Sequence, residues 1–149
     1  MRIKKTVTIG TVGAGYPAYL HGNGLEKVGG VDVRLKTICD TNLELAQKVM
    51  DRYGYEQMTA NFDELLADPE IDVIDIITPP FLHVPMAIKA MRAGKHVFSE
   101  VLPVQTVAEA VALIETVERK AIWELLQTAA VDCGLQNVPD DVTEEWREW

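Results

Sequence analysis

The chain of 149 residues is 48% hydrophobic and 25% charged, a composition that supports one globular core and leaves no room for a second full domain. Its 23 acidic residues outnumber its 14 basic ones, and the resulting net charge of −9 at pH 7 disfavours nucleic acid as a partner. The longest apolar run, 71–80, contains Asp72 and Asp75 and falls short of the ~20 residues of a membrane span, so we expect no membrane partner.

Two further features bear on the compartment. The basic start, 1–5, leads into a strand-like segment and not into the apolar region of a signal peptide. Cys39 and Cys133 are far apart and form no CxxC pair, which is typical of reduced thiols. We therefore expect a soluble, cytoplasmic protein.

Predicted strands and helices alternate along the first 120 residues. Apolar, β-branched runs mark the strands, and capping, glycine and proline residues mark the helix ends. In chain order we expect a strand at 6–12, a helix at 17–28, a strand at 31–39, a helix at 41–53, a strand at 57–59, a helix from 61 to before 69, a strand at 73–78, a helix at 82–93, a strand at 96–99 and a helix at 106–119. Capping boxes open two of the helices, Thr41 with Glu44 and Thr106 with Glu109. This alternation predicts an α/β fold of the Rossmann type, with a doubly wound parallel sheet that helices cover on both faces.

Residues 121–149 have a composition of their own. They contain all three tryptophans and seven acidic residues, against the single basic residue Arg147. Helical spacing over 121–131 predicts a continuation of the preceding helix or a partner to it, ended by Gly134, and a short helix is expected at 142–149. We divide the chain into a first domain, 1–120, and a helical tail, 121–149. The tail either covers the domain's own sheet edge or docks on a second subunit as a homodimer or with another partner, a role that tryptophan suits.

The first strand ends at a glycine-rich turn that matches the pattern GxGxxA. Its residues are Gly13, Ala14, Gly15, Tyr16, Pro17 and Ala18. In this pattern the first glycine permits the tight turn, and the second lets a pyrophosphate approach the backbone at the start of a helix. Alone the pattern is weak, because a glycine turn between strand and helix needs no ligand.

Asp40 strengthens the interpretation, because it closes the second strand 22 residues after Ala18. An acidic residue in that place accepts hydrogen bonds from the adenosine ribose of a bound dinucleotide. The alternative is that Asp40 merely begins a turn, which aspartate favours by itself. A carboxylate there would repel a 2′-phosphate, so the expected cofactor is NAD, with NADP less favoured.

Five segments together carry a resemblance to a known family. They are the turn at 10–15, the strand end Cys39-Asp40, the stretch 64–72, the loop 77–83, and the stretch from Ala93 to Glu100. Over roughly residues 5–120 this combination resembles the cofactor domain of the glucose-fructose oxidoreductase and inositol dehydrogenase family. The resemblance implies a Rossmann domain that binds NAD(P) within an oxidoreductase for a polyol or sugar-like substrate.

The resemblance also implies positions for the cofactor site. In the family, the loop matching 78–83 borders the nicotinamide ribose, and the glutamate matching Glu100 lies beside the nicotinamide. The candidate cofactor-binding residues are Gly10, Gly13, Ala14, Gly15, Tyr16, Pro17, Asp40, Thr78, Pro79, Pro80, His83 and Glu100. For His83 the alternative is a residue in the first turn of a helix that faces solvent.

Two departures from the family bear on activity. The family usually has Glu-Lys-Pro where this chain has Glu100-Val101-Leu102-Pro103, and the lysine orients and polarises the substrate hydroxyl. Valine has no donor for that task, so the catalytic residues stay unassigned, although some similar members carry Glu-Val-Pro. Family enzymes also continue into a second α/β domain that supplies the substrate pocket, and this chain has the tail in that place.

Two functions therefore remain open. The first is the NAD-binding portion of a dehydrogenase, incomplete as an enzyme by itself, and the second is a non-catalytic dinucleotide-binding or assembly module. His21, His83 and His96 lack the HxH and HExxH spacings, so no metal site is expected. A GxSxG nucleophile turn is also absent from the sequence.

Overall fold

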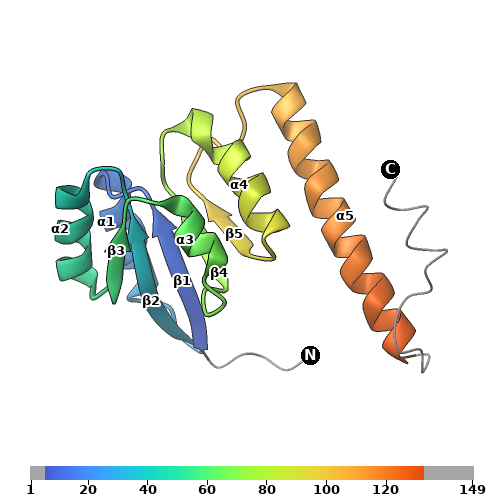
Figure 1. The fold of residues 1–149 in the computed structure, drawn as a ribbon, viewed down its shortest axis with the longest axis horizontal. Helices are drawn as coiled ribbons and strands as arrows, with labels where there is room; N and C mark the ends of the chain where they lie inside the picture. Colours follow the sequence, from blue (N-terminus) through green and yellow to red (C-terminus); the bar gives the residue numbers. More distant parts are fainter. Residues whose placement is uncertain (1–5, 133–149) are drawn as a thin grey trace. The chain divides into compact units, whose positions relative to one another are not determined.

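A computed structural model describes the backbone of residues 6–132 and the side chains of residues 6–119 (Figure 1). The expected end of a helix at Gly134 and the short helix at 142–149 lie outside the described residues. The elements are β1 (Thr6–Val12), α1 (Tyr16–Leu25), β2 (Asp32–Cys39), α2 (Leu43–Tyr53), β3 (Gln57–Thr59), α3 (Phe62–Ala67), β4 (Val73–Ile76), the 3₁₀ turn η1 (Pro80–Leu82), α4 (His83–Arg92), β5 (His96–Ser99) and α5 (Val107–Asp132).

The five strands form one parallel sheet in the order β3-β2-β1-β4-β5. The chain therefore builds outward from β1 in one direction, returns to the centre, and builds outward in the other. This order confirms the predicted doubly wound Rossmann-type sheet. In such a sheet the change of direction, here between β1 and β4, leaves a crevice at the carboxyl ends of the strands.

Helices cover both faces of the sheet, and each face has its own apolar core. On one face, residues of α1 and α2 pack with the sheet in a cluster that includes Ala18, Ile38, Ala46 and Val49. On the other face, residues of α3 and α4 pack around Ile74 and Ile76, and Leu113 of α5 joins them. The period of two along a strand explains the division, because alternate side chains of β4 point to opposite faces.

Several element ends differ from the sequence-based expectation. The second helix is capped by Asn42 and not by Thr41, because the Asn42 side chain accepts hydrogen bonds from the backbone N–H groups of Glu44 and Leu45. The expected capping box at Thr106 is confirmed, since the Glu109 N–H donates to the Thr106 hydroxyl and the Thr106 N–H donates to the Glu109 carboxylate.

Helix α1 begins and ends earlier than expected, at Tyr16 and Leu25. Gly22, which weakens the helix locally, is needed for packing: a Cβ there would lie 2.6 Å from the ring of Tyr53 in α2. Strand β4 ends at Ile76, two residues before the expected end, and the prolines that follow open η1 before α4.

The last described helix, α5, runs without a break from Val107 to Asp132. The expected segment at 121–131 is thus a continuation of the preceding helix over the residues that are described. The chain divides into two compact units, 1–113 and 114–149, and all strands belong to the first. The boundary we expect at residue 120 stays a prediction. Between residues 6 and 132, none of the helices is long and apolar enough to span a bilayer.

Candidate functional site

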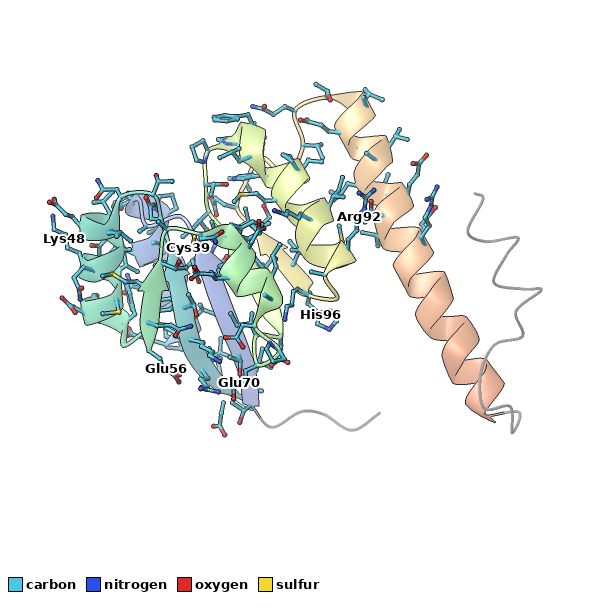
Figure 2. All side chains as sticks on the ribbon, in the orientation of Figure 1. Cys39, Lys48, Glu56, Glu70, Arg92 and His96 are labelled. Carbon is cyan, nitrogen blue, oxygen red and sulfur yellow. The ribbon has the colours of Figure 1, made fainter. Side chains whose placement is uncertain are left out.

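A cleft of about 730 Å³ opens at the carboxyl ends of the strands, where the strand order reverses. The segments that follow β1, β2, β4 and β5 all contribute to its walls. Among its lining residues are Gly13, Gly15, Pro17, Cys39, Asp40, Thr41, Ile77, Thr78, Pro79, Pro80, Glu100 and Val101. Figure 2 shows Cys39 at this end of the strands, with Glu56 and Glu70 at the opposite end.

The charged side chains at the opposite end form a separate cluster. Arg34 pairs with Glu56, and Lys36 pairs with Asp68 and Glu70. The Arg34–Glu56 pair is exposed and adds little to stability, whereas Lys36 and Asp68 are partly buried. They lie away from the cleft and play no part in the candidate site.

Gly13 makes the turn after β1 for reasons of the fold alone. Its φ of +104° lies in a region that other residues rarely adopt, and a Cβ there would lie 2.7 Å from the carbonyl oxygen of Ile77. Its N–H donates to the carbonyl oxygen of Cys39 at 2.8 Å, which ties the turn to β2. This glycine would be required with or without a ligand.

Gly15 differs, because nothing in the fold demands that it lack a side chain. Its φ of −71° is accessible to any residue, and a Cβ there would meet only Pro17 Cδ, at 3.7 Å. Gly15 is exposed, lines the cleft and forms the N-cap of α1, where no side chain caps the helix. The missing side chain therefore leaves room in front of a helix N-terminus, the position at which dinucleotide-binding folds in general hold a pyrophosphate.

The rest of the turn is divided between core and surface. Ala14 is buried at 1% exposure, whereas Tyr16 is exposed, and neither lines the cleft. Gly10 lies inside β1, and a Cβ there would meet the side chains of Ile71 and Leu65, so its role in the structure is close packing. Of the three glycines proposed for the site, Gly13 and Gly15 line the cleft and Gly10 does not.

Asp40 directly follows β2, and its carboxylate both shapes the local turn and lines the cleft. Its Oδ1 accepts from the N–H of Asn42, which is a turn-forming contact, and its Oδ2 accepts from the N–H of Ala14, both at 2.7 Å. The side chain also lines the cleft. A carboxylate has about four acceptor positions, so these two contacts leave capacity for a ligand hydroxyl.

The loop after β4, residues 78–80 and called the proline loop here, lines the cleft. His83 lies behind this loop and contacts it. Thr78, Pro79 and Pro80 are lining residues, while His83 is buried at 1% exposure and is not. Its Nδ1 lies 2.9 Å from the carbonyl oxygen of Leu102, and its Nε2 lies 2.7 Å from that of Thr78. The solvent-facing alternative for His83 is therefore wrong, and the ring joins the loop after β4 to the segment after β5.

Glu100 lines the cleft and belongs to a cluster with His21 and Asp75, two residues that were not among the predicted site residues. His21 of α1 lies between carboxylates, with Nδ1 2.9 Å from Asp75 Oδ1 and Nε2 2.7 Å from Glu100 Oε2. The hydrogen bond with His21 is the main cause that lowers the pKa of Glu100. Asp75 was visible in the sequence as a charge inside an apolar strand, which is the signal that could have revealed this cluster.

Cys39 lies in the cleft wall as a buried thiol. Burial, with smaller contributions from the charges of Asp40 and Glu64, raises its pKa to about 11. The thiolate is the nucleophilic form of cysteine, so this environment disfavours a role for Cys39 as a nucleophile.

A strand-end cleft with a glycine turn and an acid on the second strand is the arrangement of a dinucleotide-binding domain. The family described as an oxidoreductase family with an NAD-binding Rossmann fold matches residues 7–123. The chain belongs to this family. The resemblance inferred from the sequence is thereby confirmed.

Curated relatives match a large part of the chain. Levoglucosan dehydrogenase of Pseudarthrobacter phenanthrenivorans is 37% identical over 91 residues, which cover 61% of this chain and 23% of that protein. A glycosyl hydrolase family 109 protein of Shewanella baltica is 33% identical over 122 residues, which cover 76% of this chain and 26% of that protein. The chain thus spans about a quarter of the length of these relatives.

Solved structures give the same picture. Levoglucosan dehydrogenase in complex with NADH superposes with a TM-score of 0.66 at 31% identity, over 76% of this chain and 32% of that one. A myo-inositol 2-dehydrogenase from Lactobacillus plantarum superposes with a TM-score of 0.68 at 24% identity, over 76% of this chain and 33% of that one, which bears on the fold alone. The chain is an NAD-binding oxidoreductase-family domain.

Proposed function

We propose that this chain binds NAD(H) in the strand-end cleft as the cofactor portion of an oxidoreductase for a polyol or sugar-like substrate. The observation that carries the proposal is the open space at Gly15, which the fold does not require and a pyrophosphate would use. The volume of about 730 Å³ also suits a ligand of this size, because ligand pockets commonly enclose about 300–1,000 Å³.

Asp40 supports NAD in preference to NADP. Its carboxylate lines the cleft next to the glycine turn, so it can accept from the ribose hydroxyls of the adenosine half. A 2′-phosphate in the same place would meet like charge, and no lysine or arginine is among the residues that line the cleft in the described part of the chain.

The substrate class is proposed from the named relatives. Levoglucosan dehydrogenase and the family 109 glycosyl hydrolases act on carbohydrates by name, and they match 61% and 76% of this chain. When bound, NAD supplies the hydride acceptor of such a dehydrogenation. This chain's own residues would bind and orient the cofactor, through the turn at 13–17, Asp40 and the proline loop.

A non-catalytic dinucleotide-binding module is the second candidate, and Val101 is the observation that favours it. Val101 follows Glu100 in the cleft wall and is 72% exposed, at the position where the resemblance implies a lysine. A valine can neither donate a hydrogen bond nor transfer a proton. Steady NADH production from polyols by the 149-residue chain would exclude this candidate, and none is expected.

We also propose two further properties. The first is association through the C-terminal tail, as a homodimer or with a partner subunit, and the second is a cytoplasmic location. The tail's tryptophans and its apolar positions at helical spacing support the first. The unpaired spacing of the cysteines supports the second.

Calorimetric titration of the full chain with NADH tests the proposed function. Gly15→Val places a branched side chain in the open space before α1, so we expect NADH affinity to fall at least tenfold, about 1.4 kcal/mol. Gly24→Val is the matched control, because Gly24 lies in the same helix, has no atom within 4 Å of its would-be Cβ and does not line the cleft. Unchanged affinity in folded Gly15→Val would show that no nucleotide binds at this turn.

A further inference from the structure

A row of side chains crosses the sheet beneath α1. Thr11 of β1, Asp75 of β4 and Phe98 of β5 are register neighbours on adjacent strands. His21 of α1 lies over this row, with Nδ1 2.9 Å from Asp75 Oδ1 and its ring centroid 5.1 Å from that of Phe98. The first turn of α1 lines the cleft, so His21 connects a wall of the cleft to the centre of the sheet.

His21 makes both of its contacts fully only as an imidazolium. A carboxylate oxygen accepts and cannot donate, so each ring nitrogen needs a hydrogen to bond Asp75 and Glu100 together. The hydrogen bond to Asp75 is the largest cause that raises the pKa of His21 to about 9, burial opposes it, and the hydrogen bond to Glu100 adds to it. At neutral pH the ring is therefore charged.

Asp75, in the sheet under α1, holds the charged His21 ring in place. It is 1% exposed, and its Oδ2 accepts from the Thr11 hydroxyl at 3.5 Å, while Thr11 Oγ1 lies 2.7 Å from the hydroxyl of Tyr55. The Thr11 hydroxyl has one hydrogen, so when it donates to Asp75 the Tyr55 hydroxyl donates to Thr11. A buried carboxylate needs a cation, and His21 fills this role with one N–H and directs the other toward Glu100.

The strand order places Glu100 and Asp40 at opposite ends of the cleft. Asp40 follows β2 and Glu100 follows β5, with β1 and β4 between them. A dinucleotide lies across the reversal of strand order, with one mononucleotide over each half of the sheet. With the adenosine ribose beside Asp40, the nicotinamide half lies over the ends of β4 and β5, where Glu100 lines the cleft.

We propose that His21 is a positioning residue that holds the Glu100 carboxylate at the nicotinamide end of the cleft, where it accepts hydrogen bonds from hydroxyl or amide donors of that half of the cofactor. The inference rests on the proposed function, because it requires a dinucleotide in this cleft. It is limited to one half of the ligand, since the glycine turn and Asp40 have contacts of their own. The adenosine half should bind without help from His21.

Two ligands separate the halves: NADH, and ADP-ribose, which lacks the nicotinamide. In His21→Gln the side chain keeps one donor group and loses the charge, so we expect NADH affinity to fall about tenfold and ADP-ribose affinity to stay unchanged. The double variant His21→Gln/Asp75→Asn removes the buried charge together with its cation, and it serves if the single variant folds poorly. His96→Gln, an exposed histidine of β5 labelled in Figure 2, is the matched control and should change neither affinity.

The affinities of NADH and ADP-ribose, measured over a range of pH, distinguish a positioning role of His21 from a purely structural one. The groups that face His21 or act on Glu100 are Asp75, Glu100, Thr11 with Tyr55 behind it, the Phe98 ring and, through its charge, His83. Because the pKa of His21 is raised, the charged ring donates a hydrogen bond to Glu100 at lower pH. This hydrogen bond is lost as the pH rises through about 9 and the ring loses its charge. The excess affinity of NADH over ADP-ribose should decline in that range in the unmodified protein and be flat in the double variant.

Three results would overturn the inference. Equal losses for NADH and ADP-ribose would show that His21 only maintains the fold of α1. Unchanged NADH affinity in both variants would show that Glu100 needs no positioning. If neither ligand binds the unmodified chain, the proposed function fails and this inference fails with it. If ADP-ribose binds tightly and NADH binds no more tightly than ADP-ribose, the inference alone is contradicted.

Discussion

The Asp40 carboxylate and the backbone N–H of Ala14 join the second strand to the glycine turn, with 2.7 Å between Oδ2 and N. The acid expected to bind ribose therefore also stabilises the turn expected to bind the pyrophosphate. If Asp40 also selects the cofactor, a substitution there should change both the selectivity of the cleft and the stability of the turn.

We predict that the unmodified chain binds NAD(H) more tightly than NADP(H) and that Asp40→Ala narrows the gap. The same variant should lose about 1–3 kcal/mol in the free energy of unfolding, because the N–H groups of Ala14 and Asn42 lose a charged acceptor. Calorimetry with both cofactors and urea denaturation measure the two effects. Asp51→Ala, an exposed aspartate of α2, is the control, and equal or tighter NADP(H) binding by the unmodified chain would refute the role of Asp40.

Gly13 and Gly15 should differ in how far an alanine substitution lowers the free energy of unfolding. Gly13→Ala places a methyl group 2.7 Å from the Ile77 carbonyl oxygen at a positive φ, so we expect a loss of about 2 kcal/mol or more in the free energy of unfolding. Gly15→Ala has room and an ordinary φ, so it should lose no more than about 1 kcal/mol, the cost of the poorer N-cap preference of alanine. Thermal and urea unfolding of both variants check this, and similar losses in the two would contradict the division between a fold glycine and a ligand glycine.

The His21 cluster should make stability depend on pH. The folded-state pKa of His21, about 9, exceeds the ordinary value of 6.5, so its contribution is complete below pH 6.5 and disappears as the pH rises to about 9. We expect a decrease of up to about 3 kcal/mol over that window in urea unfolding. The variant His21→Gln/Asp75→Asn should show a flatter profile, and an equally steep one would assign the pH dependence to other groups.

Cys39 should react slowly in the folded chain. Its pKa of about 11, against an ordinary value of 9.0, makes the thiolate fraction at pH 8 about a hundredfold smaller, and the side chain is buried as well. Labelling by a chromogenic disulfide reagent, in a Cys133→Ser background that leaves one thiol, measures the rate. The urea-unfolded chain is the reference, and comparable rates in the two states would show that Cys39 is accessible.

The fold was predictable because its signals are local. The strand-helix alternation, the breakers and the capping box at Thr106 each depend on a few neighbouring residues, and the parallel sheet followed from them. The error at the second helix arose from a choice between adjacent capping residues. Thr41 and Asn42 can both cap a helix, and Asn42 does so where its own N–H donates to Asp40.

The candidate site was predictable where a motif spacing or the family resemblance marks its residues, but not where it depends on pairs of side chains from distant elements. The turn at 13–17 and Asp40 were found from spacing, whereas His21 lies 54 residues from Asp75 and 79 from Glu100. No periodicity joins groups so far apart, and only the strand order brings them together. His83 shows the same limit, since its burial depends on the Leu102 carbonyl 19 residues away.

The first turns of α5 present apolar side chains that suit an interface. Val107 is 82% exposed and Val111 is 49% exposed, and they are four residues apart, so they share one face of the helix. Ile114 continues the same spacing into the second unit of the chain. Exposed apolar surface of this kind on a soluble protein often marks a site of association.

We therefore predict that the full chain sediments as a symmetric dimer, the commonest soluble oligomer. Val111→Lys should shift it toward monomer, because the interface would then have to bury an unpaired charge. Leu20→Lys is the matched control, since Leu20 is an exposed apolar residue on α1, at 53% exposure. Cutting the chain after Lys120 should give a dissociated or aggregation-prone protein. A full-length chain that stays monomeric at high concentration would mean that the tail covers its own subunit, and a truncated chain that still forms a clean dimer would exclude the tail from the interface.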